Sequence, residues 1–205
     1  SVLLGDGWYR GHFGLGEPTH YERPLALIAE LRMEFADGHT ETICSDPTWQ
    51  YRSSFTTLSD IYNGETQDYT KAPGAWKRPV LVPAPGKLCD RYSSPLHYME
   101  SFCVKEVIHT PAGETVLDFG QNFAGHVICT QPVPQGTTMT LEFGEVLQNG
   151  NFYHENYRHA ESKFTYVSDG VRREIRPRFT FFGFRYVKVS GLDHVEPACF
   201  EGRAI

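Results

Sequence analysis

Short runs of β-branched and aromatic residues, separated by glycine-containing turns, recur along the chain and constrain its fold more than any other feature. In TTMTLEF, within the run at 137–147, polar and apolar residues alternate with the period of a half-buried strand. The turns read ADGHT, YNGET, PAGE, PQGT, QNGN and SDG, and are placed as hairpin connections would be. The runs cover residues 25–35, 101–109, 114–119, 126–133, 137–147, 163–167 and 184–191. This pattern predicts an all-β fold of sandwich or jelly-roll type.

The run at 25–35 admits two interpretations. Its sequence, LALIAELRMEF, is rich in Ala, Leu, Glu and Met, which are good helix formers. The segment ADGHTETI follows directly, however, and its Asp37-Gly38 pair is typical of a turn between two strands. We favour the hairpin over the helix.

The chain has 205 residues, enough for one large domain or two small ones. The segment PAPGKLCDRYSSPL concentrates proline and glycine, the composition of a connector, and a fresh strand-like run follows at 101–109. The sequence therefore predicts a boundary near residue 102, with one domain at 1–102 and a second at 103–205.

Composition and charge exclude several classes of protein. The net charge is −6 and no basic stripe is visible, so nucleic acid is not an expected partner. No stretch approaches the roughly 20 apolar residues of a membrane span, so no membrane partner is expected. No signal peptide is in view, but position 1 need not be the natural start. The cytoplasm, the periplasm and secretion all stay open.

Metal and catalytic motifs are absent from the sequence. The nine histidines form neither HxH nor HExxH, and no GxSxG nucleophile elbow is present. The five cysteines have wide spacing and no CxxC, which argues against a disulfide framework. Cys103 and Cys129 lie in strand-like runs and are expected to be small buried hydrophobes.

Four stretches, taken in order, resemble one family. The chain is similar to the non-catalytic N-terminal region of bacterial α-L-rhamnosidases, glycoside hydrolase family 78, over nearly its whole length. Residues 144–170 resemble a long hairpin segment of the same family. The four stretches are LGDGWYRG (4–11), SDIYNGETQDY (59–69), VLDFGQNFAGHV (116–127) and FTFFGFRYVKVSG (179–191).

The resemblance implies two β-sandwich domains. The first resembles a jelly roll related to carbohydrate-binding modules, and the second resembles the sandwich that precedes a catalytic (α/α)6 barrel. In this family the barrel carries the catalytic acid and base, so no catalytic residue is expected here. The barrel of the parent chain is the expected partner.

The resemblance also bears on assembly. Such domains usually begin with several strands before the segment that resembles LGDGWYRG, which here starts at residue 4. The first sandwich is therefore expected to lack its N-terminal strands. A strand missing from a sheet leaves an unpaired edge, which predicts a homodimer through that edge.

The segment DIYNGETQDY is the candidate binding site. Asn63-Gly64 is a strong signal for a tight hairpin turn. The resemblance also implies rhamnose or glycan binding, through Asp60, Asn63 and Glu65 with Tyr62 or Trp76 as an apolar face. Calcium prefers such oxygen atoms. The resemblance implies, however, that calcium-binding members of the family have an Asp-Asn pair before the Glu, where this chain has Asn63-Gly64. No cofactor is therefore expected, with calcium as the less favoured alternative.

The other motifs are expected to be structural. Gly5 and Gly7 permit unusual backbone angles, and Arg10 is expected to cap or pair. Asp118 is expected to hydrogen-bond backbone groups in a strand–turn–strand crossing, together with Gln121 and Asn122, and Arg185 to satisfy a carboxylate or backbone carbonyls. Packing against a further domain is the alternative for these polar residues.

Three functions remain from the sequence. The favoured one is a non-catalytic accessory region of an α-L-rhamnosidase, and the alternative is a glycan-binding module in its own right. An autonomous hydrolase would need a carboxylate pair, for which Glu142 with Glu145 or Asp60 with Glu65 are the candidates. Acidic residues beside turns are usually solvated, so this function is the least favoured.

Overall fold

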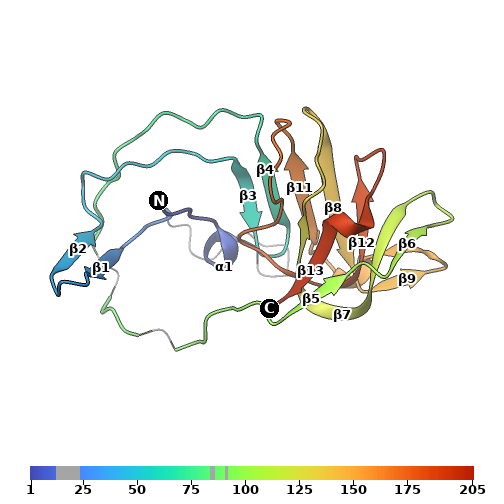
Figure 1. Ribbon diagram of the computed structural model, residues 1–205, viewed down its shortest axis with the longest axis horizontal. Helices are drawn as coiled ribbons and strands as arrows, with labels where there is room; N and C mark the ends of the chain where they lie inside the picture. The colour runs from blue at the N-terminus through green and yellow to red at the C-terminus, as the bar shows by residue number, and fades with distance from the viewer. Residues whose placement is uncertain (13–23, 84–85, 91) are drawn as a thin grey trace. The chain divides into compact units, whose positions relative to one another are not determined.

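The computed structural model describes residues 1–12, 24–83, 86–90 and 92–205 (Figure 1). The chain divides into two compact units. The first comprises Ser1–Arg23, Phe55–Ala72 and Pro95–Ile205, and the second comprises Pro24–Ser54 and Pro73–Ser94. Nearly all the regular structure is β, because the described helices are α1 (Gly7–Arg10) and the 3-10 turns η1 (Glu155–Tyr157) and η2 (Pro197–Cys199). The predicted all-β class is confirmed.

A nine-stranded sheet forms the first unit. Its strand order is β3-β4-β11-β8-β12-β7-β13-β5, with β6 paired to β7. All pairs are antiparallel except β4 with β11, which is parallel. The strands are β3 (Thr56–Asp60), β4 (Gly64–Asp68), β5 (Glu100–Cys103), β6 (Glu106–His109), β7 (Thr115–Cys129), β8 (Thr138–Gly144), β11 (Lys163–Val167), β12 (Phe182–Ser190) and β13 (Phe200–Ala204). A separate hairpin pairs β9 (Val146–Gln148) with β10 (Asn151–Tyr153).

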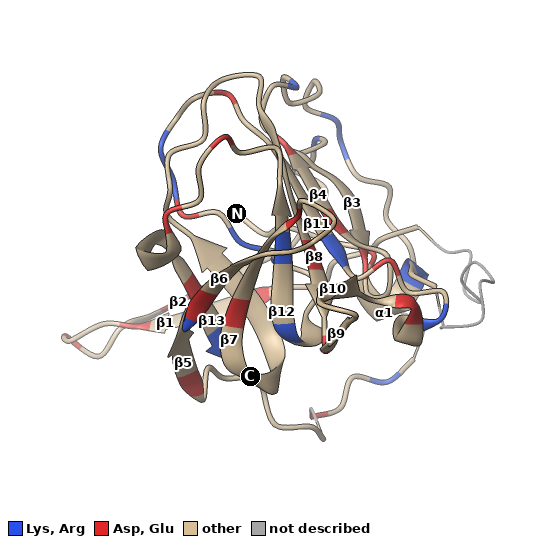
Figure 2. Cartoon of the chain, turned by 90° about the vertical axis from the view of Figure 1, so that its right-hand side faces the viewer, with Lys and Arg blue, Asp and Glu red and all other residues tan. Residues whose placement is uncertain are grey.

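The core of this unit follows the predicted alternation. On β8, Met139, Leu141 and Phe143 are fully buried, while the residues between them reach the surface. Rings contributed by different strands pack against one another, as where Phe143 stacks on Phe182 at 3.9 Å between centroids. Burial of large aromatic side chains is the main stabilising contribution in such a core. Charged residues of both signs lie on neighbouring strands of the sheet (Figure 2).

Three of the predicted strand boundaries are wrong. The runs at 114–119 and 126–133, expected as two strands around a turn, form the single strand β7. Gly120 lies between them with φ +87°, and it allows a bulge in a continuous strand instead of a reversal. Conversely, the run at 101–109 divides into β5 and β6, and the run at 137–147 divides into β8 and β9.

The second unit contains the predicted hairpin. Strands β1 (Glu30–Glu34) and β2 (Thr40–Cys44) pair antiparallel, so the helical alternative at 25–35 is excluded. Gly38 has φ +85° in the turn, a conformation that favours glycine.

Of the two cysteines predicted to be buried, one is buried and the other is exposed. Cys129 is fully buried on β7, as expected. Cys103 is exposed, because it lies at the end of β5, the last strand of the sheet.

The domain division at residue 102 falls within β5. Strands β3 and β4, from the first half of the chain, belong to the sheet that the second half builds. The division into 1–102 and 103–205 stays a prediction, as does the homodimer. The predicted dimer would pair through an edge of the first domain, and in the described part of the chain β3 and β5 are the end strands of the nine-stranded sheet.

One buried histidine predicts that the stability of this unit depends on pH. His126 on β7 is 6% exposed, and its Nε2 lies 3.2 Å from the hydroxyl of Tyr98. Burial lowers the pKa of His126 to about 4, and the nearby charges of Arg176 and Arg203 act in the same direction. Since the unfolded pKa is near 6.5, the unfolded chain takes up the proton first as the pH falls.

We therefore expect the free energy of unfolding to fall between pH 6.5 and pH 4, by on the order of 3 kcal/mol from this residue. Urea titrations across that range measure the loss. His126→Gln keeps a hydrogen-bond acceptor for Tyr98 and cannot be protonated, so its titrations should show a smaller dependence on pH. An unchanged dependence in that variant would assign the acid sensitivity to other groups.

Candidate functional site

The candidate site is the connection between β3 and β4. Asp60 pairs with Gly64, so Ile61, Tyr62 and Asn63 form a three-residue loop. Gly64 has φ +91°, and a Cβ at this position would lie 1.7 Å from the carbonyl oxygen of Lys163 on β11. The predicted tight turn is therefore present, and glycine is required both for its backbone conformation and for its close approach to β11.

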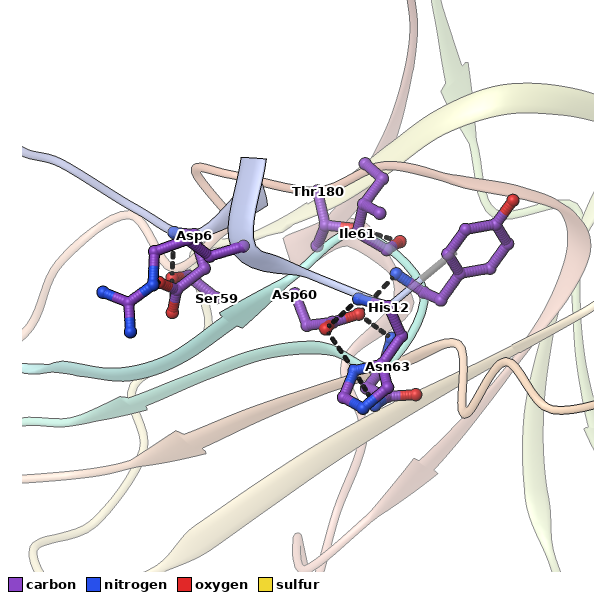
Figure 3. Close-up of polar contacts among 9 residues, drawn as sticks. Asp6, His12, Ser59, Asp60, Ile61, Asn63 and Thr180 are labelled. Atoms are coloured by element: carbon purple, nitrogen blue, oxygen red, sulfur yellow. Dashed lines mark hydrogen bonds and ion pairs between the residues drawn. The ribbon is translucent and has the colours of Figure 1, made fainter. Parts of the chain in front are cut away.

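Asp60 organises this loop (Figure 3). Its Oδ1 accepts hydrogen bonds from the backbone N–H groups of Tyr62 and Asn63, both at 2.8 Å. Its Oδ2 accepts from the backbone N–H of His12 at 2.8 Å and lies 2.7 Å from the His12 Nδ1. Burial raises the pKa of Asp60, but the bonds from Asn63, His12 and Tyr62 outweigh it and hold the pKa below its usual value.

The same carboxylate holds an N-terminal segment against β3. Gly7 forms a parallel bridge with Asp60, and the Asp6 N–H donates to the Ser59 hydroxyl at 2.9 Å. An ionised Asp60 only accepts, so the His12 Nδ1 carries the proton that points to it. The Asn63 amide lies 3.1 Å from the same nitrogen.

Glu65 is the most deeply buried acid of the site, with 1% of its surface exposed. Its Oε2 accepts from the backbone N–H groups of Arg178 and Phe179, at 2.7 and 2.9 Å. Its Oε1 accepts from the Gln67 amide at 2.6 Å, and the same amide donates to the Arg176 carbonyl. Glu65 thus ties β4 to the segment that precedes β12.

The three remaining predicted residues present more surface. Tyr62 and Asn63 are half-buried, and the Tyr62 ring meets the ring of Trp8 edge-on at 5.7 Å. Trp76 belongs to the second unit and is 57% exposed, with the Arg52 guanidinium 4.4 Å from its ring centroid. The structure therefore brings Asp60 together with Tyr62 and Asn63, whereas Glu65 on β4 has separate partners before β12. Trp76 lies in the second unit.

Sequence reasoning missed the contributions of His12 and Trp8 to this site. Both lie about 50 residues before the loop, and the available signal is the neighbouring LGDGWYRG segment, for which the sequence predicts a structural role. The expectation for Arg10 is met, because it pairs with Asp6 at 3.5 Å.

Glu142 on β8 and Glu145, which follows β8, also have partners within the chain. Lys188 binds Glu142 at 2.7 Å, and Glu145 accepts hydrogen bonds from Asn122 and Asn156. Across the described residues, no group of three or more His, Cys, Asp or Glu side chains is arranged to hold a metal ion. The described helices also include none with the length and apolar character needed to cross a membrane.

Both halves of the chain match known family models. Residues 1–94 match the α-L-rhamnosidase N-terminal domain, and residues 108–205 match the bacterial α-L-rhamnosidase concanavalin-like domain. An α-L-rhamnosidase of Streptomyces avermitilis is 36% identical over 205 residues, which cover 93% of this chain and 20% of that protein. One from Alteromonas sp. is 30% identical over 211 residues, covering 96% of this chain and 23% of that protein.

Solved structures show the same relationship. The crystal structure of the Streptomyces avermitilis α-L-rhamnosidase complexed with L-rhamnose matches with a TM-score of 0.84 at 34% identity, covering 97% of this chain and 21% of that one. The native enzyme of Aspergillus terreus matches with a TM-score of 0.86 at 27% identity, covering 98% of this chain and 25% of that one. The chain thus spans about a fifth to a quarter of the length of these relatives.

The buried hydrogen bonds of Glu65 yield a stability prediction. Glu65→Ala leaves three donors without an acceptor, so the free energy of unfolding should fall by at least about 3 kcal/mol. Glu65→Gln keeps the shape of the side chain but places an amide N–H against a donor. It should lower the free energy of unfolding by less than Glu65→Ala does.

Urea denaturation followed by circular dichroism measures both changes. Glu100→Ala is the matched control, because Glu100 is exposed on β5, and it should stay within about 0.5 kcal/mol of the unmodified chain. A Glu65→Ala variant as stable as that control would contradict the structural role of Glu65.

Proposed function

This chain belongs to the α-L-rhamnosidase family, and we propose on that basis that it is a non-catalytic accessory region of a longer α-L-rhamnosidase. The parent enzyme would hydrolyse terminal α-L-rhamnose from glycans or glycosides. The observation that carries the proposal is the pairing of two α-L-rhamnosidase domain matches in a chain about a fifth as long as its relatives.

The state of the acidic residues supports this assignment. A retaining or inverting glycosidase needs two carboxyl groups that face a sugar across the site. Here Asp60 and Glu65 are buried and accept hydrogen bonds from the chain's own donors. Glu142 pairs with Lys188. These groups stabilise the sheet and its connections, which suits a supporting domain.

The accessory role predicts no glycosidase activity in this chain alone. Residues 1–205, incubated with nitrophenyl α-L-rhamnoside, should release no nitrophenol above the buffer rate, while the parent enzyme releases it readily. Absorbance of the released nitrophenol is the measurement. Release by the isolated chain would overturn the assignment.

Deletion of the region from the parent enzyme tests the supporting role. The remaining catalytic barrel would lose the contacts that these domains supply, so it should be less stable and lose activity. A soluble, fully active barrel would refute support as the function.

Glycan binding is the second candidate, and the exposed aromatic residues favour it. Trp8 is 51% exposed beside Tyr62 and near the Asn63 loop, and Trp76 is exposed in the second unit. Ring faces pack on sugar C–H groups, and the Asn63 amide can hydrogen-bond hydroxyls. Asp60 and Glu65 would then position these contacts. The Streptomyces avermitilis relative was crystallised in complex with L-rhamnose.

Calorimetric titration with L-rhamnose tests this candidate. Heat of binding is expected at millimolar sugar, with the same affinity whether or not calcium is present. Asn63→Ala should weaken the binding, while Gln148→Ala, an exposed amide on β9, should leave it unchanged. Absence of heat at millimolar sugar would sink this candidate and leave the supporting role intact.

A further inference from the structure

Strand β7 contains a wide bulge opposite a single residue of β12. Asp118 pairs with Tyr186 and Phe123 pairs with Phe184, so the four residues 119–122 face only Arg185. Such bulges bend a strand and re-aim the side chains that it carries. Gly120 makes the bulge sterically accessible, since its φ is +87°.

An ion pair builds the bulge from both strands. The Arg185 Nε and Nη2 each donate to a different carboxylate oxygen of Asp118, both at 2.8 Å. The Gly120 N–H donates to the same carboxylate at 2.7 Å. The hydrogen bonds from Arg185 hold the pKa of Asp118 below its usual value. This confirms the expected pairing of Arg185 with a carboxylate, and it means that the bulge is a constructed feature.

The bulge exposes the middle of an otherwise buried strand. Val116–Phe119 and Gly125–Cys129 are buried, whereas Gly120, Gln121, Asn122 and Ala124 are exposed. The side chain of Gln121 has no hydrogen-bond partner within the described part of the chain. An exposed polar side chain without a partner in the middle of a strand is available to bind another molecule.

Polar groups from two further segments surround the bulge. The Glu145 carboxylate, just after β8, accepts from the Asn122 amide at 3.1 Å and from the Asn156 amide at 2.9 Å. The Tyr157 hydroxyl donates to the carbonyl of Gly183 on β12. These bonds connect η1, β7 and β12 and hold the surrounding amides in place.

The end of the chain lies against this same strand. The Ile205 N–H donates to the Ala124 carbonyl at 3.1 Å, and Ala204 pairs with Gly125. Figure 1 shows the C-terminus beside β5 and β7. In a longer polypeptide, the residues that follow position 205 would therefore start next to the bulge, and a short connection gives them a high effective concentration there.

We propose that the exposed bulge residues Gln121 and Asn122 with the neighbouring Glu145, Asn156 and Arg185, here named the bulge face, dock the polypeptide that follows residue 205 in the parent α-L-rhamnosidase. The inference rests on the proposed accessory function and identifies its contact surface. Amides and a half-exposed guanidinium suit polar loops of a neighbouring domain, because interfaces between domains of one chain are more polar than obligate subunit interfaces.

The test compares two exposed glutamines in the full-length parent enzyme. Gln121→Arg places a bulky charge on the bulge face without removing an internal hydrogen bond. Gln148→Arg makes the same change on β9, where the residue is also exposed. The readouts are the rate of limited proteolysis in the segment after residue 205 and the number of thermal unfolding transitions.

We expect Gln121→Arg to raise that proteolysis rate at least tenfold and to split one unfolding transition into two. Gln148→Arg should behave as the unmodified enzyme. Hydrogen exchange of the β8 and β11 amides should be unchanged in both variants, which shows that the sheet itself is intact. Gln121→Ala removes the amide without adding bulk and should give a smaller increase in the same direction.

Three outcomes would overturn the inference. One is equal proteolysis in both arginine variants. Another is a Gln121→Arg effect confined to the sedimentation coefficient, which would assign the face to a second copy of the chain. The third is loss of L-rhamnose binding alone. If deletion of residues 1–205 lowers the activity of the enzyme but Gln121→Arg changes neither readout, the accessory function stands. Only the assignment of the docking surface to the bulge face is then wrong.

Discussion

The carboxyl group of Glu65 joins the two halves of the sequence into one structure. It accepts two backbone N–H groups from the segment before β12, more than 110 residues away, and a third donor from its own strand. These backbone donors belong to a connection outside the strands, and the buried Glu65 carboxylate supplies their acceptor. Beside it, Gly64 lets β4 approach β11 closely enough for the parallel pairing that adds β3 and β4 to the sheet.

Asp60 also accepts backbone hydrogen bonds, from residues that are closer to it in the sequence. Its oxygens bind the loop that follows it and the backbone of His12, which fixes the N-terminal segment and the Trp8 ring beside Tyr62. A carboxylate that is occupied in this way has little remaining capacity for calcium, because the metal would compete with four existing contacts. The loop's acids therefore act chiefly by positioning, and its ring and amide surfaces are what a glycan would meet.

Asp118 and Arg185 form a similar pair at the proposed docking face. The pair stabilises a bulge that places Gln121 and Asn122 outside the sheet, and the last residue of the chain is hydrogen-bonded beside it. Three buried or half-buried carboxyl groups thus shape the connections of one β-sheet, each through donors supplied by distant segments. For an accessory region, rigid connections are useful because they keep the contact surface in a constant orientation.

The sequence by itself determined the β class, the Asp37-Gly38 hairpin and the buried face of β8, because these depend on local alternation and on turn residues. The resemblance carried by its four motifs determined the family. Only the tertiary structure decided that 114–129 is one bulged strand, that Cys103 is exposed at a sheet edge, and that β3 and β4 join strands of the second half. It alone showed that Asp60 binds His12 and that Glu65 binds the backbone of Arg178. Local patterns report which residues are apolar or turn-forming, but the partner of a buried carboxyl group is set by segments that meet only when the chain has folded.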